Sequence, residues 1–465
     1  MPSADRQCEV VVVGAGYAGL SAARRLHRLG VDVLVVEARP RVGGRVWTET
    51  LPSGAVVDHG GQWVGPGQDR LEALAAELDV GTFATFTTGA GVELRQGARH
   101  TYAGLVPTSD SVAAAEGVEA IFDLDLTAQQ VPLDAPWSAP DAVAWDEQTL
   151  GGWLTDHVKS PAARSMIDAA VKGVFGAEPG EMSLLFALFY LHAGGGLMNL
   201  ARTTGGAQER RFHGGAQQMA LALAAELGDR LLLSSPVRRV DYDDDSVVVV
   251  GEGGAGAGDG TAGVTVVRAR RAIVAMAPAL VARLEWAPAL PAARTQLSMR
   301  APMGAVTKVH AVYDAPFWRD EGLNGQLVAD TGALRITFDD SPADASHGVL
   351  VGFVVGNECR RLDDRPAEER RAVVLDDLAR AFGRRAGSPL EFVEQRWCAE
   401  PFTAGGPVAV FSPGLLTGCG EALRRPVGAV HWAGTETATR WCGYIDGALS
   451  SGERAADEVL AALAR

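Results

Sequence analysis

Hydrophobic and polar positions follow a regular order between Glu9 and Glu37. Two runs of β-branched residues, EVVVV and VDVLVVE, flank a stretch rich in alanine and leucine that ends at Gly30. The apolar positions of this stretch recur at helical spacing, and glycine is common where a helix ends. The pattern therefore predicts a strand, a glycine turn, a helix and a second strand, which together form a βαβ unit.

Similar patterns predict the rest of the organisation. Val237 to Val274 contains VVVV and GVTVVRARRAIV and predicts a hairpin, with the glycine-rich GEGGAGAGDGTAG as a loop between the strands. Pro107 to Arg202 and Pro288 to Arg396 mix helical patterns with short strands, such as FWRDEGLNGQLV and GVLVGFVVG, and predict a second lobe. From His431 onwards, HWAGTET predicts a short strand, and an amphipathic helix is expected after Gly443.

Composition narrows the class of protein. A chain of 465 residues with 47% hydrophobic and 21% charged residues suits two folded lobes. Its net charge of -15 repels nucleic-acid phosphates and anionic lipids, so we expect neither partner. No window reaches the roughly 18 apolar residues of a membrane span, and MPSADRQCEV is unlike a secretory signal, which predicts a cytoplasmic protein. The scattered cysteines predict neither a metal site nor a disulfide framework: they are Cys8, Cys359, Cys398, Cys419 and Cys442.

The turn of the βαβ unit reads GAGYAG. Gly14 permits the tight turn, Gly16 lets the backbone approach a pyrophosphate, and Gly19 allows the helix to pack closely on the strand. Glu37 ends the second strand, where a carboxylate can accept both ribose hydroxyls of an adenosine. A turn that only packs a helix on a strand is the alternative, but strand, helix and acid in register favour a dinucleotide site.

The motif alone does not separate FAD from NAD, whereas the residues after it do. EARPRVGGRVWT places Arg39 and Arg45 just beyond Glu37, with Gly43 and Gly44 allowing the backbone to approach a ligand. Two guanidinium groups there can neutralise a pyrophosphate or contact the flavin end of a cofactor. A nicotinamide enzyme has no evident use for this second cluster, so we expect FAD.

At this point the chain resembles the flavin-containing amine oxidases, most closely their monoamine oxidase branch. The resemblance rests on VVVGAGYAGLSAA, EARPRVGGRV, DHGGQWVGPGQDR, GAQERRFHGGAQQMA, PMGAVTKVHAVYDAPFW and AGTETATRWCGYIDGALSSGERAA, which together span nearly the whole chain. It implies an α/β fold with a discontinuous Rossmann-like FAD domain of the glutathione-reductase type and an α+β substrate-binding domain. The expected FAD domain comprises 1–80, 203–287 and 397–465, and the expected substrate domain 81–202 and 288–396.

The resemblance also implies the reaction and the residues of the site. The expected activity is oxidation of an amine to an imine and then to an aldehyde or ketone, with dioxygen consumed and hydrogen peroxide released. A homodimer is the expected assembly. The cofactor-binding positions carried over from the family are Gly14, Gly16, Gly19, Glu37, Ala38, Arg39, Gly44, Arg45, Gly61, Gln62, Trp63, Val237, Trp397, Gly434, Glu436, Gly443 and Tyr444. The expected substrate pocket consists of Trp63, Gly173, Val174, Ala201, Gln208, Ile336, Phe353 and Pro407.

Two residues carry the expected catalytic roles. Lys308, in VTKVHAV, matches the family lysine that holds a water against flavin N5, and Tyr444 matches one of two aromatic residues that flank the amine. The position of the other flanking aromatic residue is taken by Pro407, so we expect only half an aromatic cage. The position of the flavin-attachment cysteine is taken by Gly406, so we expect non-covalent FAD. Gly173 and Ala201 replace larger residues and predict a wider pocket.

Other substrates and another class of protein stay open. An amino-acid oxidase would need a cation for the carboxylate, for which Arg202 or Arg335 is a candidate. A polyamine oxidase would want carboxylates along the pocket, and a biosynthetic intermediate is a further alternative. A flavin-bound scaffold without catalysis is disfavoured by the presence of Lys308 and Tyr444.

Overall fold

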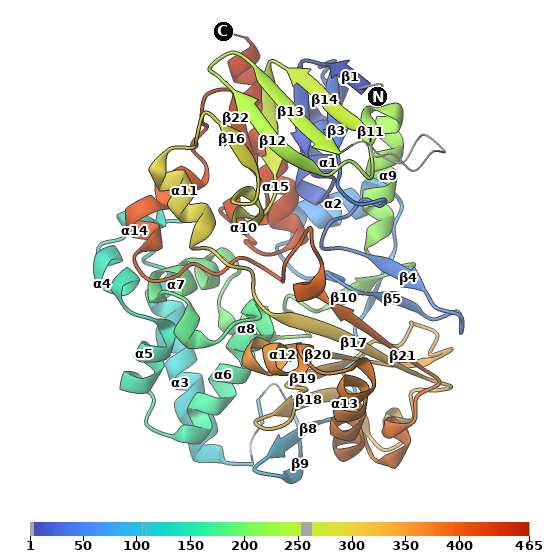
Figure 1. Ribbon diagram of the computed structural model, residues 1–465. Helices are drawn as coiled ribbons and strands as arrows, with labels where there is room; N and C mark the ends of the chain where they lie inside the picture. Colours follow the sequence, from blue (N-terminus) through green and yellow to red (C-terminus); the bar gives the residue numbers. More distant parts are fainter. Residues whose placement is uncertain (1–3, 105, 108, 253–262, 465) are drawn as a thin grey trace.

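The computed structural model describes residues 4–104, 106, 107, 109–252 and 263–464, which form two lobes (Figure 1). The upper lobe contains a five-stranded parallel sheet in the order β11-β3-β2-β15-β22. Its strands are β11 (Leu231–Leu232), β3 (Val33–Val36), β2 (Val10–Val13), β15 (Arg271–Ala275) and β22 (Val430–Ala433). β2 and β3 consist of buried valine and leucine, because both faces of the sheet are covered. With helix α1 (Tyr17–Arg28) between them, they confirm the predicted βαβ unit.

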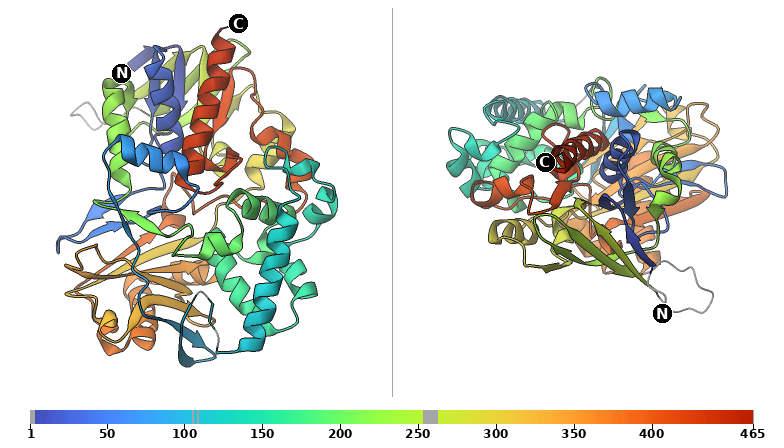
Figure 2. Two further views of the ribbon diagram at one scale, coloured as in Figure 1. Left: turned by 180° about the vertical axis from the view of Figure 1, so that it is seen from behind. Right: turned by 90° about the horizontal axis from the view of Figure 1, so that it is seen from above.

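The parallel sheet is the middle layer of three. One face carries α1, α9 (Gln217–Leu227) and α15 (Ile445–Leu463), and α1 and α15 lie side by side in both views of Figure 2. The other face packs on a second sheet in the order β1-β14-β13-β12-β16. That sheet contains β1 (Ala4–Gln7), β14 (Val264–Ala269), β13 (Val247–Glu252), β12 (Val237–Tyr242) and β16 (Glu285–Ala287).

The predicted hairpin is confirmed for β13 and β14, which pair antiparallel. The expectation of one continuous strand in GVTVVRARRAIV is wrong, because the chain leaves one sheet at Arg270 and joins the other as β15. The backbone N–H groups of Arg270 and Arg271 both donate to the Glu9 carbonyl, which fixes this crossing point. Most of the predicted glycine-rich loop, residues 253–262, lies outside the described residues.

The lower lobe is built on a mixed seven-stranded sheet in the order β21-β17-β20-β19-β18-β8-β9. Its strands are β21 (Glu391–Arg396), β17 (Val306–Tyr313), β20 (Gly348–Val355), β19 (Ile336–Asp339), β18 (Leu323–Ala329), β8 (Ala90–Arg95) and β9 (Ala98–Tyr102). Helices α12 (Gly356–Asp363) and α13 (Ala367–Phe382) contribute to the core on one face. All residues of β17 are buried, so this strand holds any polar side chain it carries in a dry environment.

A group of helices stands beside this sheet. Its members are α3 (Ser111–Ala128), α4 (Ala142–Glu147), α5 (Leu150–His157), α6 (Pro161–Phe175), α7 (Leu184–Ala193) and α8 (Leu197–Ala201), and they share a core that α7 fills with ten consecutive mostly apolar residues. The prediction of short strands between Pro107 and Arg202 is wrong, since every regular element in the described part of that range is helical. The strands of this part of the chain come earlier, between Thr82 and Tyr102.

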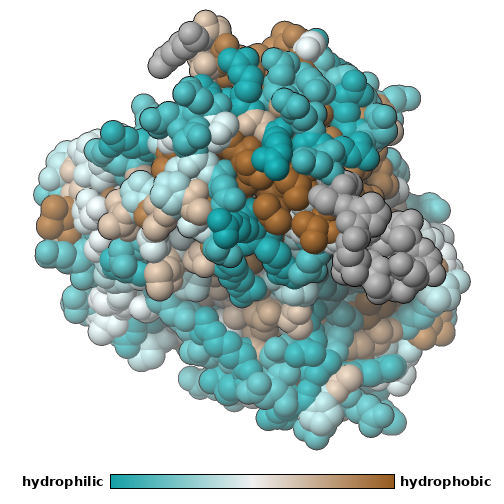
Figure 3. All heavy atoms as spheres, turned by 45° about the horizontal axis from the view of Figure 1, so that its top comes forward, coloured by the Kyte–Doolittle hydropathy of each residue, from teal (hydrophilic) through white to brown (hydrophobic). Residues whose placement is uncertain are grey.

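Shorter elements complete the two lobes and the connections between them. They are β4 (Thr48–Thr50), β5 (Val56–Asp58), β6 (Trp63–Val64), α2 (Asp69–Glu77), β7 (Thr82–Ala84), β10 (Arg210–Phe212), α10 (Pro278–Val281), α11 (Ala292–Met299) and α14 (Leu415–Cys419), with 3-10 turns that include η6 (Trp397–Ala399) and η8 (Thr435–Thr437). Hydrophilic side chains cover most of the face in Figure 3, and hydrophobic ones gather mainly near its centre. Among the described residues, no helix combines the length and the apolar character needed to cross a membrane.

Candidate active site

One cavity of about 660 Å³ runs from the β2–α1 turn to the helices of the lower lobe. It is lined by residues of both lobes, from Gly14 and Glu37 at one end to Gly173 and Ala201 at the other. Of the residues predicted for the site, all line this cavity except Gly19 and Glu436. The structure therefore brings together residues that lie as far apart in the chain as Gly14 and Tyr444.

The glycine turn leaves bare backbone at the cavity wall. Gly14 has a φ of +104°, and a Cβ on it would lie 2.8 Å from the Ala275 carbonyl oxygen. A Cβ on Gly44 would lie 3.2 Å from the Gly16 Cα, so neither glycine can carry a side chain freely. Gly19 packs its Cα against the Gly14 carbonyl, which is the helix-packing role expected of the third glycine.

The first turn of α1 opens at this bare surface. Gly16 is its N-cap residue and supplies no capping side chain, and no acidic residue occupies the first turn. Backbone N–H groups and the positive end of the helix dipole therefore meet the cavity with no acidic side chain in the first turn itself. These features fit a pyrophosphate, and hence a dinucleotide cofactor.

Glu37 and Arg39 form the next part of the wall. The Glu37 carboxylate accepts hydrogen bonds from the backbone N–H of Ala15 at 2.7 Å and of Arg39 at 2.8 Å, which fixes its position at the end of β3. The Arg39 guanidinium pairs with Glu400 at 3.2 Å and donates to the Thr403 hydroxyl. Arg39 is thus already held by the protein, and it lines the cavity from a fixed position.

Glu436 does not line the cavity, which differs from the expectation of a direct cofactor contact. It is buried and pairs with Arg45, with Nη1–Oε1 and Nη2–Oε2 distances of 2.6 and 3.1 Å. Burial alone would raise the pKa of Glu436, but the Arg45 guanidinium holds it below its usual value. Arg45 also donates to the Pro407 carbonyl at 2.7 Å. The role of Glu436 in the structure is therefore to orient Arg45, which does line the cavity.

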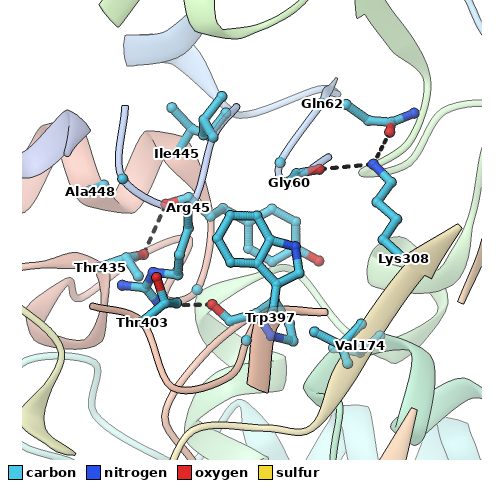
Figure 4. A pocket seen from close by; sticks show the side chains of 18 of the residues that line it. Arg45, Gly60, Gln62, Val174, Lys308, Trp397, Thr403, Thr435, Ile445 and Ala448 are labelled. Carbon is cyan, nitrogen blue, oxygen red and sulfur yellow. Dashed lines mark hydrogen bonds between the residues drawn. The ribbon is translucent and has the colours of Figure 1, made fainter. Parts of the chain in front are cut away.

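Lys308 lies on β17 and is buried. Its ammonium donates to the Asp58 carbonyl at 2.6 Å. It also donates to the Gly60 carbonyl at 2.9 Å and to the side-chain oxygen of Gln62 (Figure 4). These three acceptors match the three protons of a charged lysine. Burial lowers the pKa of Lys308 to about 8, against the opposing effect of nearby carboxylates.

Aromatic rings surround this lysine at the substrate end of the cavity. Its Nζ lies 5.4 Å from the ring centroid of Trp63 and 5.6 Å from that of Phe353. Phe338 packs on Trp63 with a centroid distance of 5.3 Å and also lines the cavity. Tyr444 lines the same space and lies directly before α15, whose N-terminus begins at Ile445.

The predicted wider pocket is only partly realised. The space beside Gly173 is filled by Ile336, because a Cβ on Gly173 would lie 2.5 Å from the Ile336 Cδ1. Ala201 is exposed and lines the cavity. The extra width expected from Gly173 is therefore absent, whereas Ala201 leaves open space.

Arg335 and Arg202, the two candidate cations for a substrate carboxylate, differ in their access to the cavity. Arg335 does not line the cavity and pairs with Glu358 at 2.5 Å. Arg202 lines the cavity, and its side chain has no ion pair or hydrogen bond with any described residue; its Nε is buried without a partner. Of the two, only Arg202 is available to a ligand.

Several lining residues were not predicted. Phe338 lies two residues after Ile336 on β19, so strand alternation could have found it. Gln326 and Thr203 line the cavity and bond each other at 2.9 Å, and Tyr102 lines it from β9. These three come from loops and strands without a motif, and only the tertiary fold brings them to the cavity.

The parallel sheet, the bare glycine turn and the adjoining apolar cavity with a buried lysine define a two-lobed dinucleotide-dependent oxidoreductase. Residues 17–460 match the family described as flavin containing amine oxidoreductase. The chain belongs to this family, and its cofactor is FAD.

Individual relatives are similar to this chain along nearly its whole length. The protein AofH of Mycobacterium tuberculosis, which bears the name of a flavin-containing monoamine oxidase, is 42% identical over 98% of this chain and 97% of its own. The pig (Sus scrofa) flavin-containing amine oxidase B is 35% identical over 99% of this chain and 87% of its own. Cyclohexylamine oxidase from Brevibacterium oxydans superposes with a TM-score of 0.91 at 34% identity, covering 98% of this chain and 100% of that one. Putrescine oxidase bound to putrescine superposes with a TM-score of 0.92 at 33% identity and the same coverage. The chain is therefore a flavin-dependent amine oxidase.

Proposed function

We propose that the protein oxidises an apolar primary or secondary amine to an imine, which water hydrolyses to an aldehyde or ketone, with dioxygen as electron acceptor. For a primary amine the oxidation balances as R₂CH–NH₂ + O₂ → R₂C=NH + H₂O₂. The choice of an apolar amine rests on one observation. Among the described residues that line the cavity, Glu37 is the only carboxylate, and it lies at the nucleotide end.

That observation favours an apolar monoamine over a polyamine. A second ammonium held beside Trp63, Ile336 and Phe353 would lose water without gaining a counter-charge, which costs several kcal/mol. An aryl or alicyclic group in the same place gains on the order of 25 cal/mol per Å² removed from water. The relatives include both a putrescine oxidase and a cyclohexylamine oxidase. The lining of this cavity supports a substrate of the second kind.

The protein's own residues divide the task between binding and positioning. Gly14, Gly16 and the start of α1 would hold the pyrophosphate, and Glu37 would hold the ribose. Arg39 and Arg45 would contact the parts of the cofactor between these two groups. FAD, when bound, supplies the acceptor for the hydride equivalent from the amine α-carbon. Tyr444 and Pro407 would flank the amine, and the apolar wall would orient its substituent. Lys308 supplies a fixed positive charge at this end of the cavity.

Further parts of the proposal concern the whole molecule. We assign 1–80, 203–287 and 397–465 to the FAD domain, and 81–202 and 288–396 to the substrate domain. The parallel sheet supports this division, since its strands come from all three stretches of the first set. We further propose non-covalent FAD, a cytoplasmic location and assembly as a homodimer.

Arg202 supports a second candidate substrate, an apolar amine that carries a carboxylate at its far end. The Arg202 side chain lacks a partner among the described residues, and a guanidinium binds a carboxylate with two parallel hydrogen bonds. A peroxide-coupled assay with matched amines separates the candidates. Equal kcat/KM for a neutral amine and its carboxylate-bearing analogue would favour the first, and a preference for the analogue that Arg202→Met abolishes would favour the second.

A further inference from the structure

A buried chain of hydrogen bonds continues beyond Lys308. The Gln62 amide accepts from the Lys308 ammonium through Oε1 and donates to the Asp340 carboxylate through Nε2, at 2.6 Å. Gln62 and Asp340 are both nearly inaccessible, at 1% and 2%. An ammonium can only donate and a carboxylate can only accept, so the chemistry of its two neighbours fixes the orientation of the amide.

Asp340 is itself held on its other side. Arg211 donates to its Oδ1 at 2.9 Å and to its carbonyl at 2.8 Å, and this guanidinium is also buried. His310, fully buried on β17, places its Nε2 3.6 Å from the Asp340 Oδ2. Burial lowers the pKa of His310 well below its usual value, so this ring is neutral and adds no positive charge beside Asp340.

The charged groups around Lys308 come from several elements. Asp58 on β5 has a pKa raised to about 6 by burial, and Asp340 follows β19; both favour the charged lysine. Arg211 on β10 opposes it. His59 has a lowered pKa because of its burial, although Glu49 pairs with it at 2.7 Å. Without the two carboxylates, burial would favour a neutral lysine.

We propose that Asp340 is a positioning residue for Lys308, which acts through the Gln62 amide to keep the lysine charged and directed at the segment 58–62. The inference rests on the proposed function in one respect, namely that dioxygen accepts the electrons and that Lys308 supplies a fixed positive charge at the substrate end of the cavity. The first electron creates negative charge on oxygen, and a fixed cation in a dry site stabilises that charge. In this account the Asp340–Gln62 pair sets the pH range in which the cation is available.

The sequence offers a direct way to observe this lysine. The chain contains only three lysines, Lys159, Lys172 and Lys308. Protein labelled with ¹³C at the lysine ε-carbon should therefore give three resolved titration curves by NMR. This measurement does not require the enzyme to turn over a substrate. The curve that Lys308→Met removes belongs to Lys308, and Lys172, which pairs with Asp168 and Glu178, serves as an internal control.

Two variants with opposite charge changes test the proposal. Asp340→Asn removes the carboxylate but keeps the size and an acceptor for Gln62, and it should lower the Lys308 midpoint by roughly one pH unit. Gln62→Glu adds a carboxylate next to the ammonium and should raise the midpoint. Stopped-flow reoxidation by dioxygen should show its pH inflection moving in the same directions, while anaerobic reduction of Asp340→Asn by the amine keeps the wild-type profile.

The possible results separate this inference from the proposed function. Lys308 midpoints that stay at the wild-type value in both variants would overturn the positioning role, even if peroxide is still formed. Lack of peroxide from every amine, with the midpoints shifted as expected, would instead refute the proposed function and leave the positioning role standing. If Asp340→Asn does not fold, Asp340→Ser carries the same test, because it also removes the carboxylate and keeps a hydroxyl acceptor for Gln62, whereas a purely structural role predicts no downward shift of the Lys308 midpoint.

Discussion

Gly173 and Ile336 occupy one space at the substrate end of the cavity. Ile336 projects from β19 so closely that a Cβ on Gly173, which lies on α6, would come within 2.5 Å of its Cδ1. The glycine makes room for a side chain of the facing sheet instead of making room for substrate. The size of Ile336 therefore determines how much of the cavity a substrate can use.

Replacing Ile336 by alanine should enlarge the substrate space. We expect kcat/KM for a bulky cyclic amine to rise about tenfold relative to benzylamine, because losing or gaining a few methylene contacts in an apolar pocket has effects of about this size. The matched control is Gly173→Ala in the Ile336→Ala background. The added methyl group should fill part of the enlarged space and reduce the preference for the cyclic amine over benzylamine. Identical ratios in all three proteins would show that substrates bind elsewhere.

FAD should be bound without a covalent bond. Gly406 stands where the resemblance places the attachment cysteine, and the described residues that line the cavity include no cysteine. Cys442 is buried and Cys398 is partly buried, and a hydrogen bond with Cys359 lowers the pKa of Cys398 to about 7. Acid precipitation of the yellow protein should release all colour into the supernatant. Colour that stays in the washed pellet would contradict the prediction, and its peptide map would identify the attached residue.

Loss of the lysine charge should slow reoxidation selectively. Lys308→Met should bind FAD and be reduced by the amine, but react with dioxygen at least tenfold more slowly, because no cation then stabilises the charge formed on oxygen. In the wild-type enzyme the same rate should fall as the pH rises through about 8, where burial places the lysine pKa. Lys172→Met is the control, since Lys172 is a buried, ion-paired lysine that does not line the cavity. Equal oxygen rate constants in all three proteins would refute this role.

Arg202 should exclude diamines. Its guanidinium lines a cavity that offers no carboxylate at the substrate end, so it repels a second ammonium. Arg202→Met should raise kcat/KM for putrescine severalfold and leave benzylamine nearly unchanged, while Arg202→Lys, which keeps the charge, should resemble the wild type. Steady-state peroxide assays at constant ionic strength provide the comparison. A putrescine rate that does not respond to Arg202→Met would place the guanidinium away from the substrate.

The sequence predicts the parts of this molecule that depend on short-range rules. The βαβ unit around Gly14 and Glu37 follows from residue periodicity and glycine chemistry, and the structure confirms it. The crossing between sheets at Arg270 was missed, because both strands have the same β-branched composition and only their partners differ.

Side-chain partnerships were the least predictable part. The pairing of Arg45 with Glu436 joins residues nearly four hundred positions apart, so an alignment can suggest both as cofactor contacts without showing that one orients the other. The same applies to Gly173. From the sequence its missing side chain suggests open space, but in the structure Ile336 fills that space. Asp340 stands in no motif, and its link to Lys308 exists only through the folded Gln62.

The central claim is oxidation of an apolar amine, and the most direct test is peroxide formation by the purified holoenzyme with benzylamine, a bulky cyclic amine, putrescine and spermidine. The account predicts that the apolar amines have the higher kcat/KM, and that this value rises with pH towards each substrate's own pKa, because the amine must be neutral before its α-hydrogen is transferred. Omitting dioxygen should stop peroxide formation. A polyamine that exceeds both apolar amines by tenfold or more would contradict the account, since the cavity would then have to hold a carboxylate where Trp63, Ile336 and Phe353 lie.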